Sequence, residues 1–215
     1  GVSVDPDVDR LALICEDGKA FGEEYTLVSI ADYLLSRVYN EALETGKSIE
    51  EVAAPYQLTT ASNLSSSRAL RDVTEQYGGE YFAAAVGEVN VTTKMRACGA
   101  IIGGEGNGGV IYPALHYGRD AMVGVALFLT NLAYKKMKVS ELRATYPEYV
   151  IAKNKIELSD SALIDKILEE VKTVYAAEDI NTIDGVKISF EARKEWVHLR
   201  RSNTEPIIRI YAEAA

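Results

Sequence analysis

The sequence is poor in the residues that build thiolate and imidazole metal sites. Among 215 residues it has two histidines and two cysteines, Cys15 and Cys98. Both cysteines lie in apolar runs, as expected of buried free thiols, and no Cys/His spacing predicts a zinc site. No hydrophobic run is long enough to span a bilayer, because the longest, such as Ala121 to Ala133, are interrupted. No signal peptide is recognised. We therefore expect a cytoplasmic protein that does not contact membranes.

Positive charge is also scarce. The 23 Lys and Arg residues against 32 Asp and Glu give a formal net charge of -9. Nucleic acid is not an expected partner, because its binding requires a basic surface that displaces counterions. A phosphorylated small molecule stays possible, since a few well-placed Arg and Lys residues suffice to bind it. The chain is long enough for one large domain or two modest ones.

Strands and helices alternate along the first two thirds of the chain. Apolar residues at helical spacing predict a long helix over residues 24–43, and a serine cluster at 65–67 supplies N-cap candidates for the helix after it. This order predicts a layered α/β domain over residues 24–147. After Pro147, a strand, a helix and three more strands predict a small α+β domain over 148–215, with the helix on one sheet face. The other predicted strands cover residues 2–4, 11–15, 57–61, 81–86 and 100–102, and the other helices cover 70–77, 89–97 and 119–136.

The first candidate site is the acidic loop Asp5-Pro-Asp-Val-Asp-Arg10, which leaves a strand. Carboxylates at alternate positions, Asp5, Asp7 and Asp9, can face one hard cation, and oxygen ligands suit Mg²⁺ or Ca²⁺. An EF-hand is rejected, because Arg10 replaces the turn glycine that its loop requires and no helix enters. An exposed acidic turn remains the alternative.

The second candidate site is the glycine-rich loop Gly103-Gly-Glu-Gly-Asn-Gly-Gly109. It matches the dinucleotide-binding pattern, but that pattern needs a helix to open at once. The residues that follow, Val110 to Pro113, predict extended chain instead. Glu105 and Asn107 are then polar groups on a tight scaffold that can bind sugar hydroxyls. A purely structural glycine turn is the alternative.

The third candidate site is Arg200-Arg-Ser-Asn-Thr-Glu-Pro206, between two strands of the last domain. A guanidinium, hydroxyls, an amide and turn N–H groups can together bind an anion, and phosphate most strongly. A polar turn without a ligand is the alternative.

In this order, the three loops resemble those of the α-D-phosphohexomutase superfamily, which includes phosphoglucomutases, phosphomannomutases and phosphoglucosamine mutases. The family has four domains around one cleft, with an Asp-x-Asp-x-Asp-Arg metal loop, a Gly-Glu-x-Ser/Asn-Gly sugar loop and an Arg-x-Ser-Asn-Thr-x-Pro phosphate loop. The resemblance covers essentially the whole chain. It implies that residues 1–23 end domain two, 24–147 form domain three and 148–215 form the TATA-box-binding-protein-like domain four.

The resemblance also implies roles for individual residues. Asp5, Asp7 and Asp9 would ligate Mg²⁺, with Arg10 beside the transferring phosphoryl group. Lys94, in a segment similar to a family loop before a short helix, is a candidate for ligand contact or proton transfer. The ligand would be a hexose or hexosamine phosphate. Glu105 and Asn107 would bind its sugar hydroxyls, and its non-reacting phosphate would be bound by Arg200, Ser202, Asn203 and Thr204.

Two departures from the family pattern limit these expectations. The phosphoserine that carries the phosphoryl group belongs to the family's first domain, and nothing here matches its context. We therefore expect the parent protein to be an intramolecular phosphotransferase and this chain alone to be inactive; a non-catalytic phosphosugar-binding module is the alternative. Many members also have His where this chain has Gly109. His116 is a substitute candidate, or a structural histidine. The sugar and the oligomeric state are left open.

Overall fold

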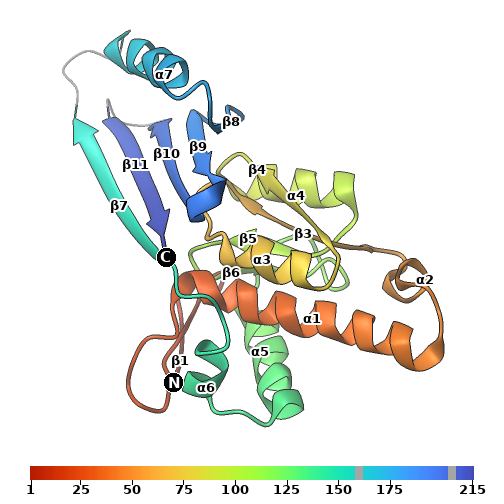
Figure 1. Ribbon diagram of the computed structural model, residues 1–215. Helices are drawn as coiled ribbons and strands as arrows, with labels where there is room; N and C mark the ends of the chain where they lie inside the picture. Colours follow the sequence, from red (N-terminus) through yellow and green to blue (C-terminus); the bar gives the residue numbers. More distant parts are fainter. Residues whose placement is uncertain (158–161, 203–206) are drawn as a thin grey trace. The chain divides into compact units, whose positions relative to one another are not determined.

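The computed structural model describes residues 1–157, 162–202 and 207–215. The chain divides into two compact units, Gly1–Pro147 and Glu148–Ala215 (Figure 1). The first unit is an α/β layered structure and the second is an antiparallel sheet with one long helix, in agreement with the predicted fold class. Within the parts that the structure describes, no helix is long and apolar enough to cross a membrane.

The first unit contains a hairpin, a mixed sheet and six helices among its described residues. Its strands are β1 (Val2–Val4), β2 (Leu11–Leu13), β3 (Gln57–Asn63), β4 (Glu80–Ala84), β5 (Ala100–Glu105) and β6 (Gly109–Ile111). Its helices are α1 (Glu23–Thr45), α2 (Ile49–Ala53), α3 (Ala69–Gln76), α4 (Glu88–Cys98), α5 (Ala121–Lys135) and α6 (Val139–Arg143).

The mixed sheet has the strand order β4-β3-β5-β6, with β3 parallel to both β4 and β5 and with β6 antiparallel to β5. The chain moves from β3 to β4 in one direction and then crosses back past β3 to β5. Right-handed crossovers therefore place α3 and α4 on opposite sheet faces, and α1 packs on the α3 side (Figure 1). The reversal of direction creates a switch point at the carboxyl ends of β3 and β5, where α/β sheets bind their ligands.

Apolar side chains fill the space on both faces of this sheet. Phe21 and Phe128 are among the largest fully buried side chains, and their rings meet edge to face at 5.1 Å between centroids. Under α4, small residues of the strands meet Val91 and Met95, both fully buried. The long helix α1 has buried residues on almost every turn because it lies between α3, α5 and the sheet.

Helix ends follow local signals in the sequence. Asp120 caps α5, because its carboxylate accepts hydrogen bonds from the backbone of Met122 and Val123. The N-cap residue of α3 is Arg68, which makes no side-chain cap hydrogen bond, so the expected serine N-cap is not observed; Ser67, one residue earlier, accepts a hydrogen bond from the backbone of Ala69 at 3.1 Å.

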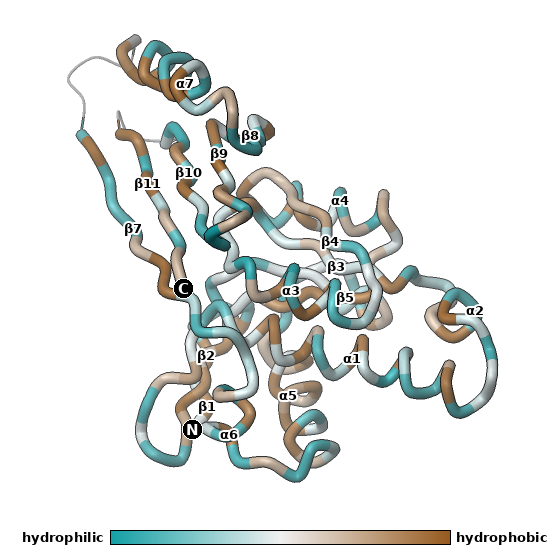
Figure 2. The backbone as a smooth tube through the Cα atoms, viewed as in Figure 1, coloured by the Kyte–Doolittle hydropathy of each residue, from teal (hydrophilic) through white to brown (hydrophobic). Residues whose placement is uncertain are grey.

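The second unit is a five-stranded antiparallel sheet with the order β7-β11-β10-β9-β8. Helix α7 packs against β9 and alternates between hydrophobic and hydrophilic segments along its turns (Figure 2). The elements are β7 (Val150–Glu157), α7 (Ala162–Val174), β8 (Asp179–Asn181), β9 (Val186–Phe190), a 3-10 turn (Glu191–Arg193), β10 (Glu195–Arg201) and β11 (Ile207–Ala214).

Candidate functional site

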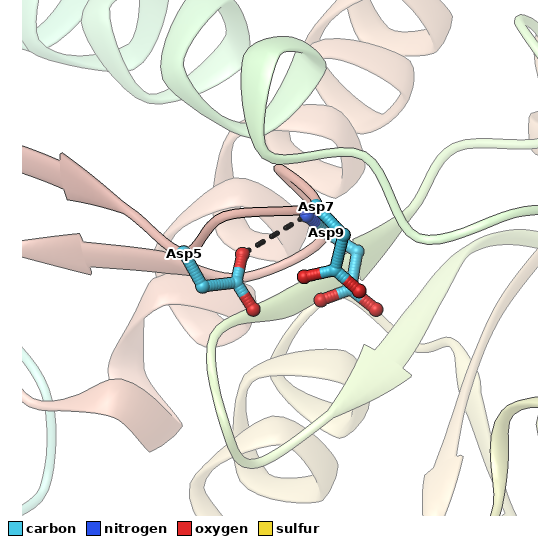
Figure 3. A group of neighbouring side chains, drawn as sticks. All are labelled: Asp5, Asp7 and Asp9. Atoms are coloured by element: carbon cyan, nitrogen blue, oxygen red, sulfur yellow. Dashed lines mark hydrogen bonds between the residues drawn. The ribbon is translucent and has the colours of Figure 1, made fainter.

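The acidic loop joins the antiparallel strands β1 and β2, so the expected absence of an entering helix is confirmed. Asp5 fixes the loop, since its carboxylate accepts hydrogen bonds from the backbone N–H of Arg10 at 3.0 Å and of Asp9 at 3.1 Å. Figure 3 shows the hydrogen bond from Asp9. Val8 adopts a left-handed conformation with φ 58°. Its carbonyl accepts a hydrogen bond from Ala121 at 3.0 Å, which ties the loop to the first turn of α5.

The donor set of this loop fits a hard divalent cation. Oxygen atoms of Asp5, Asp7 and Asp9 all lie within 4.8 Å of one another, and the three side chains project toward a common region (Figure 3). Asp9 Oδ1 is buried and accepts no hydrogen bond from the described residues. A buried carboxylate oxygen without a donor is costly, and a cation ligated by oxygen would satisfy it.

The pKa values of two of these carboxylates move in opposite directions. Partial desolvation is the largest influence on Asp9 and raises its pKa; the attraction of Arg119 opposes this rise, and the contact with Asp5 and repulsion from Asp7 and Asp5 add to it. Desolvation opposes ionisation of Asp5 as well, but hydrogen bonds from the backbone of Arg10 and Asp9 overcome it and lower the pKa of Asp5.

The glycine-rich loop connects β5 to the antiparallel strand β6, so no helix follows it. The expectation that the residues after Gly109 are extended is confirmed, and the dinucleotide-binding arrangement of strand, loop and helix is absent from this segment. The loop lies at the carboxyl end of β5, beside the end of β3. It is therefore at the switch point of the sheet.

Glu105 ends β5 and is 5% exposed. One of its carboxylate oxygens accepts hydrogen bonds from the side-chain amide of Asn63 at 2.8 Å and from the backbone of Gly87 at 3.3 Å. The other accepts from Arg119 Nη1 at 2.8 Å. Glu105 is thus held in one orientation by groups from three different segments.

The rest of the glycine-rich loop is held by close backbone contacts. Gly106 donates its N–H to the hydroxyl of Ser66 at 2.9 Å, and Asn107 Oδ1 accepts from the backbone of Gly109 at 3.1 Å. Asn107 is the half-buried member of an otherwise buried run over residues 103–110. Its amide nitrogen makes no hydrogen bond to the described residues, and so it is available to a ligand.

The two loops lie directly against each other, although nearly one hundred residues separate them in the sequence. The backbone N–H of Leu11 donates to the carbonyl of Gly108 at 3.0 Å. A Cβ atom at Gly108 would lie 2.3 Å from the carbonyl oxygen of Leu11, and Gly108 also has φ +84°. Only glycine therefore fits where the chain segments cross.

Arg119 joins the two loops, and the sequence did not single it out. Its guanidinium forms ion pairs with Asp9, with Glu105 at 2.8 Å and with Glu88 at 3.3 Å. The backbone N–H of Arg119 also donates to Glu88 at 3.0 Å. The available signal was the excess of acidic residues in the two loops, which requires a nearby cation when such groups are half buried.

The three catalytic candidates lie in different surroundings. Arg10 is about half exposed, and its Nε lies 3.8 Å from Asp5 and 3.7 Å from Asp9. His116 accepts a hydrogen bond from the backbone of Gly118 at Nδ1 and lies 3.1 Å from Asp120 at Nε2, so it supports the turn that precedes α5. Lys94 is half buried on α4 and has no ion pair with the described residues.

The third candidate site belongs to the second unit. Arg200 lies on β10, is largely buried, and its Nε is 3.3 Å from the carboxylate of Asp184. Ser202 is 5% exposed, and its backbone N–H donates to the carbonyl of Ile207 at 3.0 Å, which extends the pairing of β10 with β11 by one residue. Asn203 and Thr204 lie outside the described residues. The carbonyl of Asp184 accepts from the buried His198 at 2.6 Å.

Comparison with known proteins identifies the family. Residues 24–149 match the model of Phosphoglucomutase/phosphomannomutase, alpha/beta/alpha domain III, and residues 152–215 match that of the Phosphoglucomutase/phosphomannomutase C-terminal domain. The chain belongs to the phosphoglucomutase/phosphomannomutase family. The resemblance recognised in the three loops is thereby confirmed as a match to the C-terminal portion of these proteins.

Curated relatives align with the full length of this chain. The phosphoglucosamine/phosphogalactosamine mutase of Sulfurisphaera tokodaii is 32% identical over 217 residues, and these are 100% of this chain and 44% of the relative. The phosphoglucomutase/phosphomannomutase of Thermococcus kodakarensis is 32% identical over 216 residues, or 43% of its length. The chain thus spans less than half the length of these relatives.

Solved structures of the family share the fold. A phosphoglucomutase/phosphomannomutase family protein from Burkholderia thailandensis superposes with a TM-score of 0.73 at 24% identity, covering 100% of this chain and 42% of that one. The Paramecium phosphoglucomutase pp63/parafusin, in its open form, gives a TM-score of 0.75 at 21% identity, covering 99% and 40%.

Proposed function

We propose that this chain is the C-terminal part of a phosphohexomutase, which moves a phosphoryl group between positions 1 and 6 of a hexose or hexosamine phosphate. The observation that carries the proposal is the direct contact between the acidic loop and the glycine-rich loop, through Leu11 and Gly108 and through Arg119. Groups suited to a cation and groups suited to sugar hydroxyls are thereby brought to one sheet edge.

In this proposal Asp5, Asp7 and Asp9 hold Mg²⁺. When bound, Mg²⁺ offsets the negative charge that develops on the transferring phosphoryl group. Arg10 is exposed beside the same carboxylates, where its guanidinium can reach a phosphoryl oxygen and add a second positive charge.

Sugar recognition falls to Glu105 and Asn107. Glu105 is fixed by its protein donors and accepts from a hydroxyl through its remaining lone pairs, while Asn107 has a free amide to donate. Phosphate binding falls to Arg200, Ser202, Asn203 and Thr204 of the second unit. Lys94 and His116 remain candidates for ligand contact or proton transfer.

The donor of the phosphoryl group is a phosphoserine that we place outside this chain. The serine run is unsuited to this role, because Ser66 and Ser67 are buried and bound to Gly106 and Ala69. The serine would give its phosphoryl group to the sugar phosphate. The resulting bisphosphate would turn around and return its other phosphate to the serine.

The metal role is tested by titrating Mg²⁺ into the chain and following the heat released. Asp7→Asn should weaken binding by about tenfold or more, or roughly 1.4 kcal/mol, since it removes a charged ligand. Asp17→Asn is the matched control, because Asp17 is an exposed acidic residue outside the cluster. Equal affinities of the two variants would contradict the metal assignment.

Catalysis is tested by phosphorus NMR of glucose and glucosamine phosphates. The 215-residue chain should bind these sugars without moving the phosphate, whereas the chain joined to a serine-bearing N-terminal portion should interconvert the 1- and 6-phosphates. Turnover by the chain alone would refute the assignment of the phosphoserine. Binding without turnover in the longer protein would favour a non-catalytic phosphosugar-binding module.

A further inference from the structure

Arg119 is the only described residue whose side chain forms ion pairs with both the acidic loop and the glycine-rich loop. Its side chain is 14% exposed. The guanidinium nitrogens lie near three different carboxylates: Nη2 pairs with Asp9, Nη1 donates a hydrogen bond to Glu105, and Nε is 3.3 Å from Glu88 without a hydrogen bond to it. These three acids come from the β1–β2 loop, the end of β5 and the first turn of α4.

This arrangement depends on the shape of the arginine side chain. A guanidinium presents its Nη donors in a fixed plane, so the positions of the Asp9 and Glu105 carboxylates are set relative to each other. A lysine ammonium is a single point of charge on a flexible stem and cannot hold the same two directions. Arg119 also enters this cluster from a short segment pinned at both sides, by its own N–H to Glu88 and by the helix cap Asp120.

The pairing leaves one oxygen of Asp9 for a ligand and holds both oxygens of Glu105 in place. Arg119 binds Asp9 through Oδ2, and Asp9 Oδ1 stays buried without a hydrogen bond from the described residues. Arg119 binds Glu105 through Oε2, while Asn63 and Gly87 hold Oε1. One arginine therefore orients a proposed cation ligand and a proposed sugar ligand at the same time.

We propose that Arg119 is a positioning residue that sets Asp9 for the cation and Glu105 for the sugar together, so that cation binding at the acidic loop is transmitted to the glycine-rich loop. The inference rests on the proposed function, because it assumes that the acidic loop binds a divalent cation. It adds a residue and a coupling to that function.

The two possible roles of Arg119, as a positive charge and as a positioning residue, predict opposite changes in cation affinity when Arg119 is replaced. A guanidinium next to a cation site repels the cation, so its removal should tighten binding if Arg119 acts only as a charge. If Arg119 orients Asp9, its loss should weaken binding, as is usual when residues that orient a metal ligand are replaced. Lysine separates the two effects further, since it keeps the charge and loses the planar fork.

The experiment is Mn²⁺ titration of the chain, monitored by the electron paramagnetic resonance of the free ion. Arg119→Lys and Arg119→Met should each weaken Mn²⁺ binding by about tenfold. Arg71→Met is the matched control, because Arg71 pairs with Glu75 on the exposed face of α3 and should leave Mn²⁺ affinity unchanged. Circular dichroism confirms that each variant is folded, and Arg119→Lys decides the question if Arg119→Met does not fold.

A second readout follows the coupling itself. The backbone N–H of Gly87 donates to Glu105 and reports on its carboxylate. Diamagnetic Mg²⁺ should shift the Gly87 amide resonance in the wild-type chain, and the shift should disappear in Arg119→Lys at Mg²⁺ concentrations that saturate the variant. Loss of the shift together with weakened Mn²⁺ binding supports the proposal.

Other outcomes overturn it in distinguishable ways. Wild-type binding with equal or tighter binding by Arg119→Lys would remove the positioning role and leave the metal site intact. The same holds if the Gly87 shift persists in Arg119→Lys. No Mn²⁺ binding by the wild-type chain would refute both the metal site and the coupling.

Discussion

Tyr146 donates its hydroxyl to the buried carboxylate of Asp32 at 2.8 Å. Asp32 lies in the middle of α1, is 4% exposed, and also accepts from Tyr77 at 2.7 Å and from Lys135. The Asp32 carboxylate therefore connects α1 to three other segments: the end of the first unit, helix α5 and the residues after α3. A buried carboxylate needs several donors of this kind to be tolerated.

Replacement of Tyr146 by Phe should lower the free energy of unfolding of the first unit by about 2 kcal/mol, since a hydrogen bond to a buried charge is lost without a large change in volume. Chemical denaturation followed by far-ultraviolet circular dichroism measures the change. Tyr117→Phe is the control, because the ring of Tyr117 packs against Arg96 and the core under α4, and its hydroxyl makes no hydrogen bond to Asp32. Similar losses in both variants would show that the contact with Asp32 contributes little.

His198 should make the second unit sensitive to acid. Burial lowers the pKa of His198 to about 4, below its ordinary value of about 6.5. Between these values the unfolded chain binds the proton and the folded chain does not. Stability is therefore retained above about pH 6.5 and lost as the pH falls toward 4, by about 2 kcal/mol at pH 5.

The fluorescence of the single tryptophan, Trp196, reports on the unfolding of this unit, because Trp196 lies on β10 and is buried. His198→Gln removes the titrating group and should flatten the change in stability between pH 7 and pH 5. His116→Gln, at an exposed histidine, should keep the wild-type pH dependence. An unchanged pH dependence in His198→Gln would contradict this account.

Gly108→Ala should destabilise the first unit more than Gly18→Ala does. Both glycines have φ +84°, but a Cβ at Gly18 meets no atom within 4 Å, whereas one at Gly108 meets the carbonyl of Leu11 at 2.3 Å. Both substitutions therefore introduce the same backbone strain. The difference between their effects on stability measures the steric clash where the two chain segments cross. We expect an additional loss of about 2 kcal/mol in denaturation experiments. Equal losses would mean that the two loops separate at little cost.

Arg200→Ala should weaken the binding of glucose 1-phosphate by about 1.5–3 kcal/mol, because a charge-assisted contact to phosphate is lost. Titration calorimetry measures the affinity. Arg193→Ala is the control, since Arg193 is an exposed arginine of the same unit that pairs with Glu195 at 2.9 Å. Equal affinity of the two variants would argue against phosphate binding at this loop.

The sequence predicted the long elements well, because α1 carries helical periodicity, α5 is a long apolar stretch with a cationic last turn, and β5 begins as a short apolar run. It missed the five-residue helices α2 and α6 and the three-residue strand β8, whereas the residues of β6 were predicted as extended chain. Such elements are too short to show a period. For α2, however, the capping box of Ser48 and Glu51 was a readable local signal.

The motif loops were found from the sequence, but the contacts that join them were not. Asn63, Glu88 and Arg119 belong to no shared motif. They meet Glu105 or one another only because β3 ends, α4 begins and the turn before α5 lies at the same sheet edge. Their proximity follows from the strand order β4-β3-β5, which local patterns do not encode.

The crowding at Gly108 changes how variation among relatives should be interpreted. A glycine at this place is required by the passing carbonyl of Leu11, whatever ligand the loop binds. Its invariance would therefore report on loop architecture and carry no information about substrate choice. If the loop binds the sugar as we propose, differences in specificity between family members are better sought at Asn107, which is half buried in an otherwise buried loop.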